Sequence, residues 1–409
     1  MDKALQALDR TLSVVGISVF NKSNWDTKGW FAFQISNVIV SFTYFVVSTI
    51  FVFINTTNIT IFIQGSSIWV IGLTVPLWLA MCLVLRRNFR MFLEEMVFVD
   101  CLLDMPFLKL VLSEGEGTKT TELKHLINST QTALFKYSRM LLLFYLWCTY
   151  MVYILYVCIP IYEIIVTNDP SLRPLAFGMW FPWDLENLYV YSFTFIYNFY
   201  FGNLCCIVYS GIQLMIVLLV GQKIRHLKVL TFILLNLDEL AKEFVKQNKE
   251  QWQIFCTAVL IQCVDHYVKL KKFSNKLNKT CQPFYLSIIM VATTLFCLCS
   301  VKIAISDKLA LDTMKYYVIE FCYIMVMMVY CFLGQQVDNE CEKLDIAVTE
   351  KWYIYNRQHK IKMRIFKMAT GQRMPIYIFG SVTLSLPTFT WFIKTGMSCF
   401  TLMMSVIED

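Results

Sequence analysis

Four small hydroxyl side chains recur in the apolar run over residues 387–409, PTFTWFIKTGMSCFTLMMSVIED. Steps of three, three and four residues place them on one face of a helix; they are Thr395, Ser398, Thr401 and Ser405. A helix with a lipid face and a narrow hydroxyl face lines a water-filled path when several subunits surround one axis. The same hydroxyls also suit bonds back to helix carbonyls or contacts with neighbouring helices, and the spacing leaves both interpretations open.

Residues that would support enzymatic chemistry are sparse. The sequence holds no glycine-rich phosphate loop, no HExxH motif and no GxSxG motif. The histidines lie far apart in the sequence, at His125, His226, His266 and His359. Fifteen cysteines are scattered without a pair at metal-ligand spacing. We therefore expect no enzyme, no cofactor and no metal site.

The composition is that of a membrane protein. Of 409 residues, 57% are hydrophobic and only 16% are charged, and the mean hydropathy is +0.56. A soluble domain carries far more charge, so the sequence predicts a polytopic helical protein in contact with membrane lipid. The net charge of +7 follows from basic segments on one side of the membrane and implies no nucleic-acid partner.

Charge-poor stretches predict an all-α protein with seven spans. Six lie at 31–53, 61–85, 140–165, 188–220, 284–301 and 316–333. A seventh stretch, 376–406, is too long for one span, and Pro387 divides it because proline breaks a helix. The expected divisions are a cytosolic N-terminus (1–30), the six-helix ligand-binding bundle with cytosolic extensions (31–333), cytosolic anchor and assembly helices (334–386), and the pore-lining helix with an extracellular C-terminus (387–409).

The orientation follows from Lys and Arg. They concentrate near the N-terminus and after the second, fourth and sixth spans, whereas the other connections hold only Arg173, Lys302, Lys308 and Lys315. This bias predicts a cytosolic N-terminus and, after seven spans, an extracellular C-terminus. Helical spacing in 221–282, with one polar break at 247–250, and in 338–374 predicts that spans continue into a cytosolic helical bundle where subunits meet. Solvated helices without a partner are the alternative.

Aromatic and apolar side chains share one depth, the outer half, on the second, third, fourth and sixth spans. The candidates are Trp69, Leu73, Tyr150, Tyr153, Tyr191, Phe195, Phe321 and Tyr323. Such a set can wall a pocket for a small volatile or hydrophobic ligand, and ordinary helix packing is the competing interpretation. The connection at 167–186, rich in Pro, Trp and Phe, either anchors at the membrane interface through Trp180 and Trp183 or folds over the pocket as a lid.

The last third of the sequence resembles the insect odorant receptor family. The resemblance rests on Tyr330-Cys331-Phe332-Leu333-Gly334, Trp352-Tyr353, Pro375, Gly380, Leu384-Ser385-Leu386, Phe389, Ile393-Lys394-Thr395, Ser398, Phe400 and Thr401-Leu402. The inverted seven-span layout and the chain length also agree. Met397 and Cys399 stand where the family has tyrosines, and the insertion typical of the co-receptor is absent.

The resemblance implies a ligand-binding subunit of an odorant-gated, non-selective cation channel in the plasma membrane of a sensory dendrite. Such subunits form heterotetramers with a co-receptor, and permeant cations pass through a central pore lined by the last span. The family's hydrophobic gate falls at Leu402, beside Thr401, and its ligand pocket lies among spans two, three, four and six. A gustatory-type channel, a metabotropic seven-span receptor and a transporter are the alternatives; sparse charge and missing repeat symmetry disfavour the last.

Overall fold

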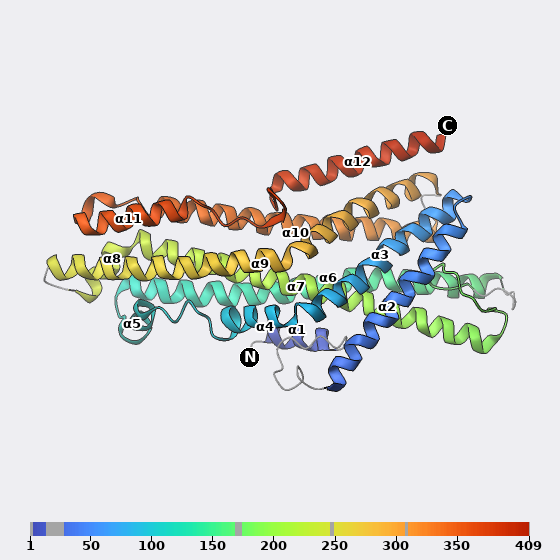
Figure 1. The fold of residues 1–409 in the computed structure, drawn as a ribbon, viewed down its shortest axis with the longest axis horizontal. Helices are drawn as coiled ribbons and strands as arrows, with labels where there is room; N and C mark the ends of the chain where they lie inside the picture. The colour runs from blue at the N-terminus through green and yellow to red at the C-terminus, as the bar shows by residue number, and fades with distance from the viewer. Residues whose placement is uncertain (1–2, 14–27, 168–173, 246–248, 307–309, 409) are drawn as a thin grey trace.

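The computed structural model describes residues 3–13, 28–167, 174–245, 249–306 and 310–408, and within them it is almost entirely helical (Figure 1). Six helices are long and apolar enough to cross a membrane. They are α2 (Lys28–Ile54), α3 (Ile59–Val84), α6 (Thr118–Thr167), α7 (Leu188–Leu235), α9 (Lys249–Ile305) and α10 (Leu311–Ala347). Each carries one of the first six predicted spans, and only Leu85 of the second span lies beyond its helix, as the C-cap of α3. The seventh predicted span is α12 (Leu386–Glu408), a separate helix of 23 residues.

Three helices are much longer than a bilayer is thick. The lengths of α6, α7 and α9 are 50, 48 and 57 residues, so each extends over about 70 Å or more at ~1.5 Å per residue, against a hydrocarbon core of ~30 Å. They run along the long axis of the molecule (Figure 1). Residues 246–248, which overlap the polar break predicted at 247–250, lie outside the described residues, between α8 (Leu237–Phe244) and α9.

Helix α7 lies at the centre of the bundle. From Val208 to Leu234 nearly every side chain is buried, because α6, α9 and α10 pack around it and α1 (Lys3–Ser13) packs against it as well. A helix that is apolar on all sides is stable only when neighbours cover all of its faces. The apolar run of the fourth predicted span therefore becomes the core of the protein.

Short elements close the end of the bundle that the sequence assigns to the cytosol. After α3 the chain forms α4 (Arg86–Leu93), a π-helical turn (Glu94–Phe98) and α5 (Pro106–Glu114). After α10 it forms a 3₁₀ turn (Trp352–Ile354) and α11 (Arg357–Thr370). Helices expected after the fourth and sixth spans are thus present, as the C-terminal part of α7 with α8 and the start of α9, and as α11, while their cytosolic location stays a prediction.

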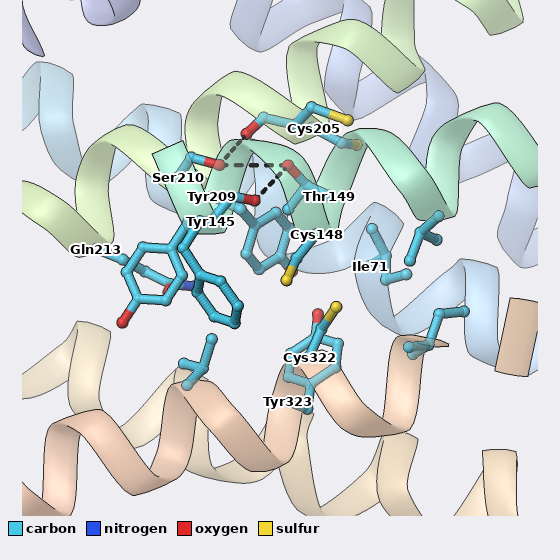
Figure 2. A pocket seen from close by; sticks show the side chains of 15 residues that line it. Ile71, Tyr145, Cys148, Thr149, Cys205, Tyr209, Ser210, Gln213, Cys322 and Tyr323 are labelled. Atoms are coloured by element: carbon cyan, nitrogen blue, oxygen red, sulfur yellow. Dashed lines mark hydrogen bonds between the residues drawn. The ribbon is translucent and has the colours of Figure 1, made fainter. Parts of the chain in front are cut away.

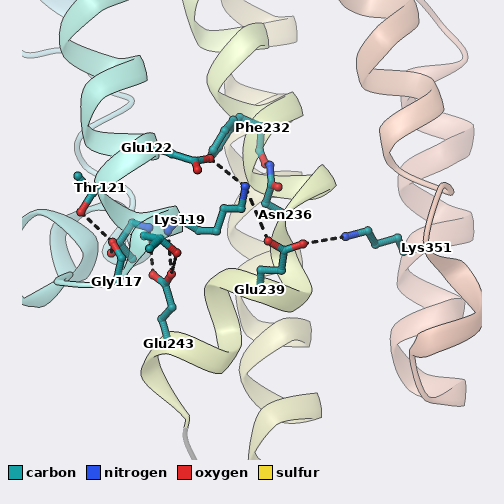
Figure 3. A network of polar contacts seen from close by, with 11 residues as sticks. Gly117, Lys119, Thr121, Glu122, Phe232, Asn236, Glu239, Glu243 and Lys351 are labelled. Carbon is teal, nitrogen blue, oxygen red and sulfur yellow. Dashed lines mark hydrogen bonds and ion pairs between the residues drawn. The ribbon is translucent and has the colours of Figure 1, made fainter.

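A polar network holds α6 and α8 together at this end (Figure 3). The Glu243 carboxylate accepts hydrogen bonds from the backbone N–H groups of Lys119 (2.7 Å) and Thr120 (3.0 Å). These N–H groups have no partner within a helix, and the helix dipole also favours an anion there. Glu239 lies 3.8 Å from both Lys119 and Lys351 and so extends the network. Lys351 also forms an ion pair of 2.7 Å with Asp238. The start of α6 is therefore fixed by a side chain distant in sequence.

Residues 377–383 form a β-hairpin where helices were expected. Strand β1 (Tyr377–Phe379) pairs antiparallel with β2 (Val382–Thr383), and Gly380 turns the chain with a φ of +53°, a conformation that glycine adopts without steric cost. The hairpin leads directly into α12, whose second residue is Pro387. Proline suits the first turn of a helix because its missing N–H has no partner there.

Candidate functional site

A cavity of about 110 Å³ lies among α3, α6, α7 and α10 (Figure 2). It is lined by Ile71, Phe144, Tyr145, Cys148, Thr149, Val152, Cys205, Cys206, Tyr209, Ser210, Gln213, Ile319, Cys322, Tyr323 and Val326. Rings, thiols and aliphatic groups make up most of the wall. A lining of this kind accommodates a small apolar molecule and leaves a few polar atoms to orient it.

Two buried polar atoms at this wall are unsatisfied. Neither the Tyr145 hydroxyl nor Oε1 of Gln213 makes a hydrogen bond within the described residues. By contrast, the Thr149 and Ser210 hydroxyls lie 3.3 Å apart and each donates to a carbonyl of its own helix. Buried polar groups are nearly always hydrogen-bonded, and an exception requires an explanation. A bound molecule with a donor group would supply one.

A second cavity, of about 70 Å³, shares Ile71, Val152 and Cys205 with the first. Tyr153 on α6 reaches its wall where Gly202 leaves room, since a Cβ at that glycine would lie 2.2 Å from the Tyr153 ring. Phe177, from the connection before α7, also lines this cavity. Ala176, Met179 and Phe181 of the same connection are buried, so its described part packs onto the helices as a cover.

The eight residues predicted to wall a ligand pocket occupy different environments. Tyr323 lines the first cavity and Tyr153 the second. Tyr150 packs edge-on against Tyr153, with ring centroids 6.2 Å apart. Leu73 and Phe321 have exposed side chains and line neither cavity. Adjacent residues on a helix point in directions that differ by ~100°. Phe321 therefore faces outward, although its neighbour Cys322 lines the first cavity.

The other three predicted residues make contacts away from both cavities. Trp69 donates its indole N–H to Thr49 at 2.8 Å, and Tyr191 donates its hydroxyl to the carbonyl of Pro174 at 2.9 Å. The ring of Phe195 packs near that of Tyr191, with ring centroids 6.1 Å apart. The first cavity begins at Cys205 on α7, about 15 Å further along the helix than Phe195 at ~1.5 Å per residue. Gln213, a polar residue in an apolar run, is the signal that sequence reasoning missed.

Helix α12 packs one face on α9 and leaves the opposite face uncovered. Phe392 is fully buried, and a Cβ at Gly396 would lie 2.2 Å from the Phe296 ring. The predicted pore residues Ser398, Thr401, Leu402 and Ser405 are all exposed in the single chain. The three hydroxyls donate to carbonyls of their own helix at 2.8–2.9 Å. These hydroxyls therefore bond back to their own helix, and the lining of a water-filled path by the same face stays a prediction.

Comparison with known sequences identifies relatives of one kind. A sequence model of the family described as 7tm odorant receptor matches residues 58–397. Odorant receptor 13a of Drosophila melanogaster is 24% identical over 278 residues, which cover 63% of this chain and 64% of that relative. Odorant receptor 63a of the same fly is 22% identical over 245 residues, covering 58% and 54%. The match therefore spans less than two thirds of either relative.

Comparison of folds gives a match over the whole chain. The olfactory receptor OR5 of Machilis hrabei superimposes with a TM-score of 0.72 and 12% sequence identity, over 99% of this chain and 98% of that one. The structure of OR5 in complex with eugenol also matches with a TM-score of 0.72, over 99% of this chain and 100% of that one. At this identity the likeness concerns the fold.

Proposed function

Because the chain belongs to the 7tm odorant receptor family, we propose that it is the ligand-binding subunit of an odorant-gated, non-selective cation channel. It is a membrane-spanning receptor and not an enzyme. The proposed location is the plasma membrane of a sensory dendrite, with the N-terminus in the cytosol. The proposed partners are co-receptor subunits in a heterotetramer, membrane lipid and permeant cations.

The observation that carries the proposal is the cavity among α3, α6, α7 and α10 with its two unsatisfied polar atoms. An apolar wall selects a small hydrophobic molecule, and the Tyr145 hydroxyl and Gln213 Oε1 would orient a polar group on it. The complex of OR5 with eugenol supports a small-molecule ligand. Helix α10 carries part of the wall, and its Gly334 lies against Leu384, which joins the hairpin to α12, so α10 can transmit ligand binding to the pore helix.

Filling the first cavity is expected to weaken the response to odorant. Val326→Phe places a ring where the wall is now aliphatic, so we expect at least a roughly tenfold higher half-effective odorant concentration, a loss of about 1.4 kcal/mol. Currents from cells that express the receptor with its co-receptor measure the effect. Met328→Phe is the matched control, because Met328 lies on the same helix with its side chain exposed. An unchanged dose–response curve for Val326→Phe would remove this cavity as the ligand site.

An apolar constriction at Leu402 is the proposed gate. The Leu402 side chain is 68% exposed in the single chain, on the same face as Ser398, Thr401 and Ser405. A ring of such side chains around an axis excludes water when it is narrow, and a slight widening lets water and ions return. The hydroxyls on either side would wet the path. The opposite face of α12 is already covered by α9, which leaves this one for the pore.

Leu402→Ser is expected to raise the current that flows without odorant, because a hydroxyl keeps water in the constriction. The measurement compares unstimulated and odorant-evoked currents at equal surface expression. Met397→Ser provides the control, since Met397 is also exposed but lies about 140° from Leu402 around the helix. If both variants leave the unstimulated current at its original level, Leu402 does not form the gate.

Assembly is supported by an apolar stripe on α11. Ile361, Ile365 and Met368 are 50%, 56% and 70% exposed, and their spacing places them on one helical face. This helix belongs to the part assigned to the cytosol, where no lipid covers apolar side chains. Exposed apolar stripes in such positions usually mark a contact with another chain, here a neighbouring subunit of the proposed channel.

A further inference from the structure

Three potential metal ligands from separate elements converge in the cytosolic bundle. Cys101 lies in the connection before α5, His226 on α7 and His266 on α9. One ligand atom from each lies within 4.8 Å of the others. Both histidines are buried, whereas Cys101 is half-buried, so Cys101 forms the most exposed side of the cluster. Two of the ligands come from histidines that are 40 residues apart in the sequence, which is why no sequence motif reveals them.

The two imidazoles face each other at the separation of metal ligands. Nδ1 of His226 lies 3.3 Å from Nε2 of His266. In a tetrahedral zinc site with Zn–N bonds of about 2.0–2.1 Å, two ligand nitrogens are about 3.3 Å apart. Burial lowers the pKa of His226, and it lowers the pKa of His266 to about 3. Both rings are therefore neutral at neutral pH, the form in which imidazole binds metals.

A carboxylate orients the first of these rings. The other nitrogen of His226, Nε2, lies 3.4 Å from Oδ1 of Asp100, and neither atom makes a hydrogen bond within the described chain. The second oxygen of Asp100 is held by Arg225 at 2.7 Å. Histidine ligands commonly face a carboxylate with the nitrogen that does not bind the metal. Asp100 has a φ of +46°, so its backbone adopts the left-handed conformation immediately before Cys101.

We propose that Cys101, His226 and His266 bind one Zn²⁺ ion, which fastens the connection before α5 to α7 and α9. Two imidazoles and a thiolate suit zinc, and a water molecule would complete a tetrahedral site on the open side. Burial raises the pKa of the Cys101 thiol to about 11, so the thiol keeps its proton in the metal-free protein, and the Zn²⁺–sulfur bond would form as that proton is released to solvent. Sδ of Met96 lies 3.7 Å from Sγ of Cys101, and because thioethers favour Cu⁺, copper is included in the test.

The test measures metal binding by the full-length protein, purified in detergent and freed of metal by dialysis. Competition with a chromophoric chelator is expected to give about one Zn²⁺ per chain, and Co²⁺ is expected to produce a thiolate-to-cobalt charge-transfer band. Cys101→Ser and His266→Gln should each lower the affinity for Zn²⁺ by at least roughly 10–100-fold. A loss of this size is typical when a residue that only supports a metal ligand is replaced, and a ligand itself matters at least as much. Cys263→Ser and His359→Gln are the controls, since both residues are buried in the same bundle.

Three results would each overturn the proposal. They are the absence of saturable Zn²⁺ binding, equal Zn²⁺ binding by wild type and Cys101→Ser, and binding of Cu⁺ without Zn²⁺. If His266→Gln does not fold, the half-buried Cys101 still provides the decision through loss of the cobalt charge-transfer band in Cys101→Ser. Odorant-evoked current is not needed as a readout, so failure of the zinc site is distinguishable from failure of the proposed receptor function.

Discussion

Arg225→Met is expected to lower the free energy of unfolding by roughly 3–5 kcal/mol, because it leaves the Asp100 carboxylate buried without its cation. Arg225 and Asp100 are 2% and 6% exposed, and their side chains meet at 2.7 Å. Burial disfavours the charged carboxylate, but the hydrogen bond from Arg225 and the adjacent imidazole of His226 outweigh it and hold the pKa of Asp100 at about 2. Asp100 is therefore charged at neutral pH and depends on this contact.

The measurement is the thermal midpoint of the protein in detergent, compared with that of Arg373→Met. Arg373 also forms an ion pair, with Asp338 at 3.1 Å, but its side chain is 42% exposed, and a pair of this kind contributes only about 0–1 kcal/mol. Adding Asp100→Asn to Arg225→Met should restore part of the loss, because the charge left unpaired is then removed. Equal midpoints for Arg225→Met and Arg373→Met would show that the buried ion pair stabilises the fold no more than the exposed one.

Gly334→Ala is expected to abolish most odorant-evoked current while the protein still reaches the cell surface. A Cβ at Gly334 would lie 2.1 Å from the carbonyl oxygen and 2.7 Å from the carbonyl carbon of Leu384. Leu384 joins the hairpin to α12, and its backbone cannot yield as a flexible side chain would. The methyl group must push α10 away from the segment that positions the pore helix, at a cost of about 1–3 kcal/mol.

Current and surface labelling, recorded together, test this expectation. Gly371→Ala is the matched control, because a Cβ there meets its nearest neighbour, the carbonyl oxygen of Lys367, at 3.4 Å, an ordinary contact. Retained current in Gly334→Ala would mean that the contact between α10 and the hairpin is not part of gating. Loss of surface expression in Gly334→Ala alone would instead indicate that the contact is needed for folding.

Helix positions were predictable from the sequence because apolar length and helical spacing are local properties. The first six predicted spans each fall on one long helix, with Leu85 just beyond the end of α3, and the described part of the predicted polar break, 249–250, begins α9. The hairpin at 377–383 was not predicted, since its strands hold only three and two residues, too few to show an alternating pattern. Gly380 was the available signal for the turn.

The walls of the cavities were not predictable to the same extent. The four helices that carry the predicted pocket residues also enclose the first cavity, but membrane helices are apolar on all sides, so hydrophobicity does not reveal which face points inward. Leu73 and Phe321 are exposed for this reason. The cluster of Cys101, His226 and His266 depends on the packing of three elements, which no local pattern encodes.

Because α7 is one unbroken helix, a small tilt about one of its ends would move the other end by a larger distance. Its C-terminal half is enclosed by neighbours, whereas its first turns carry many exposed side chains. A rod of 48 residues that pivots by ~2° about its C-terminal end displaces its N-terminal end by ~2.5 Å, at ~1.5 Å of rise per residue. The enclosed half lies nearer the pivot and moves by less than about half of that distance. A small rotation at the C-terminal end of α7 and a larger displacement of its N-terminal end would therefore be one movement.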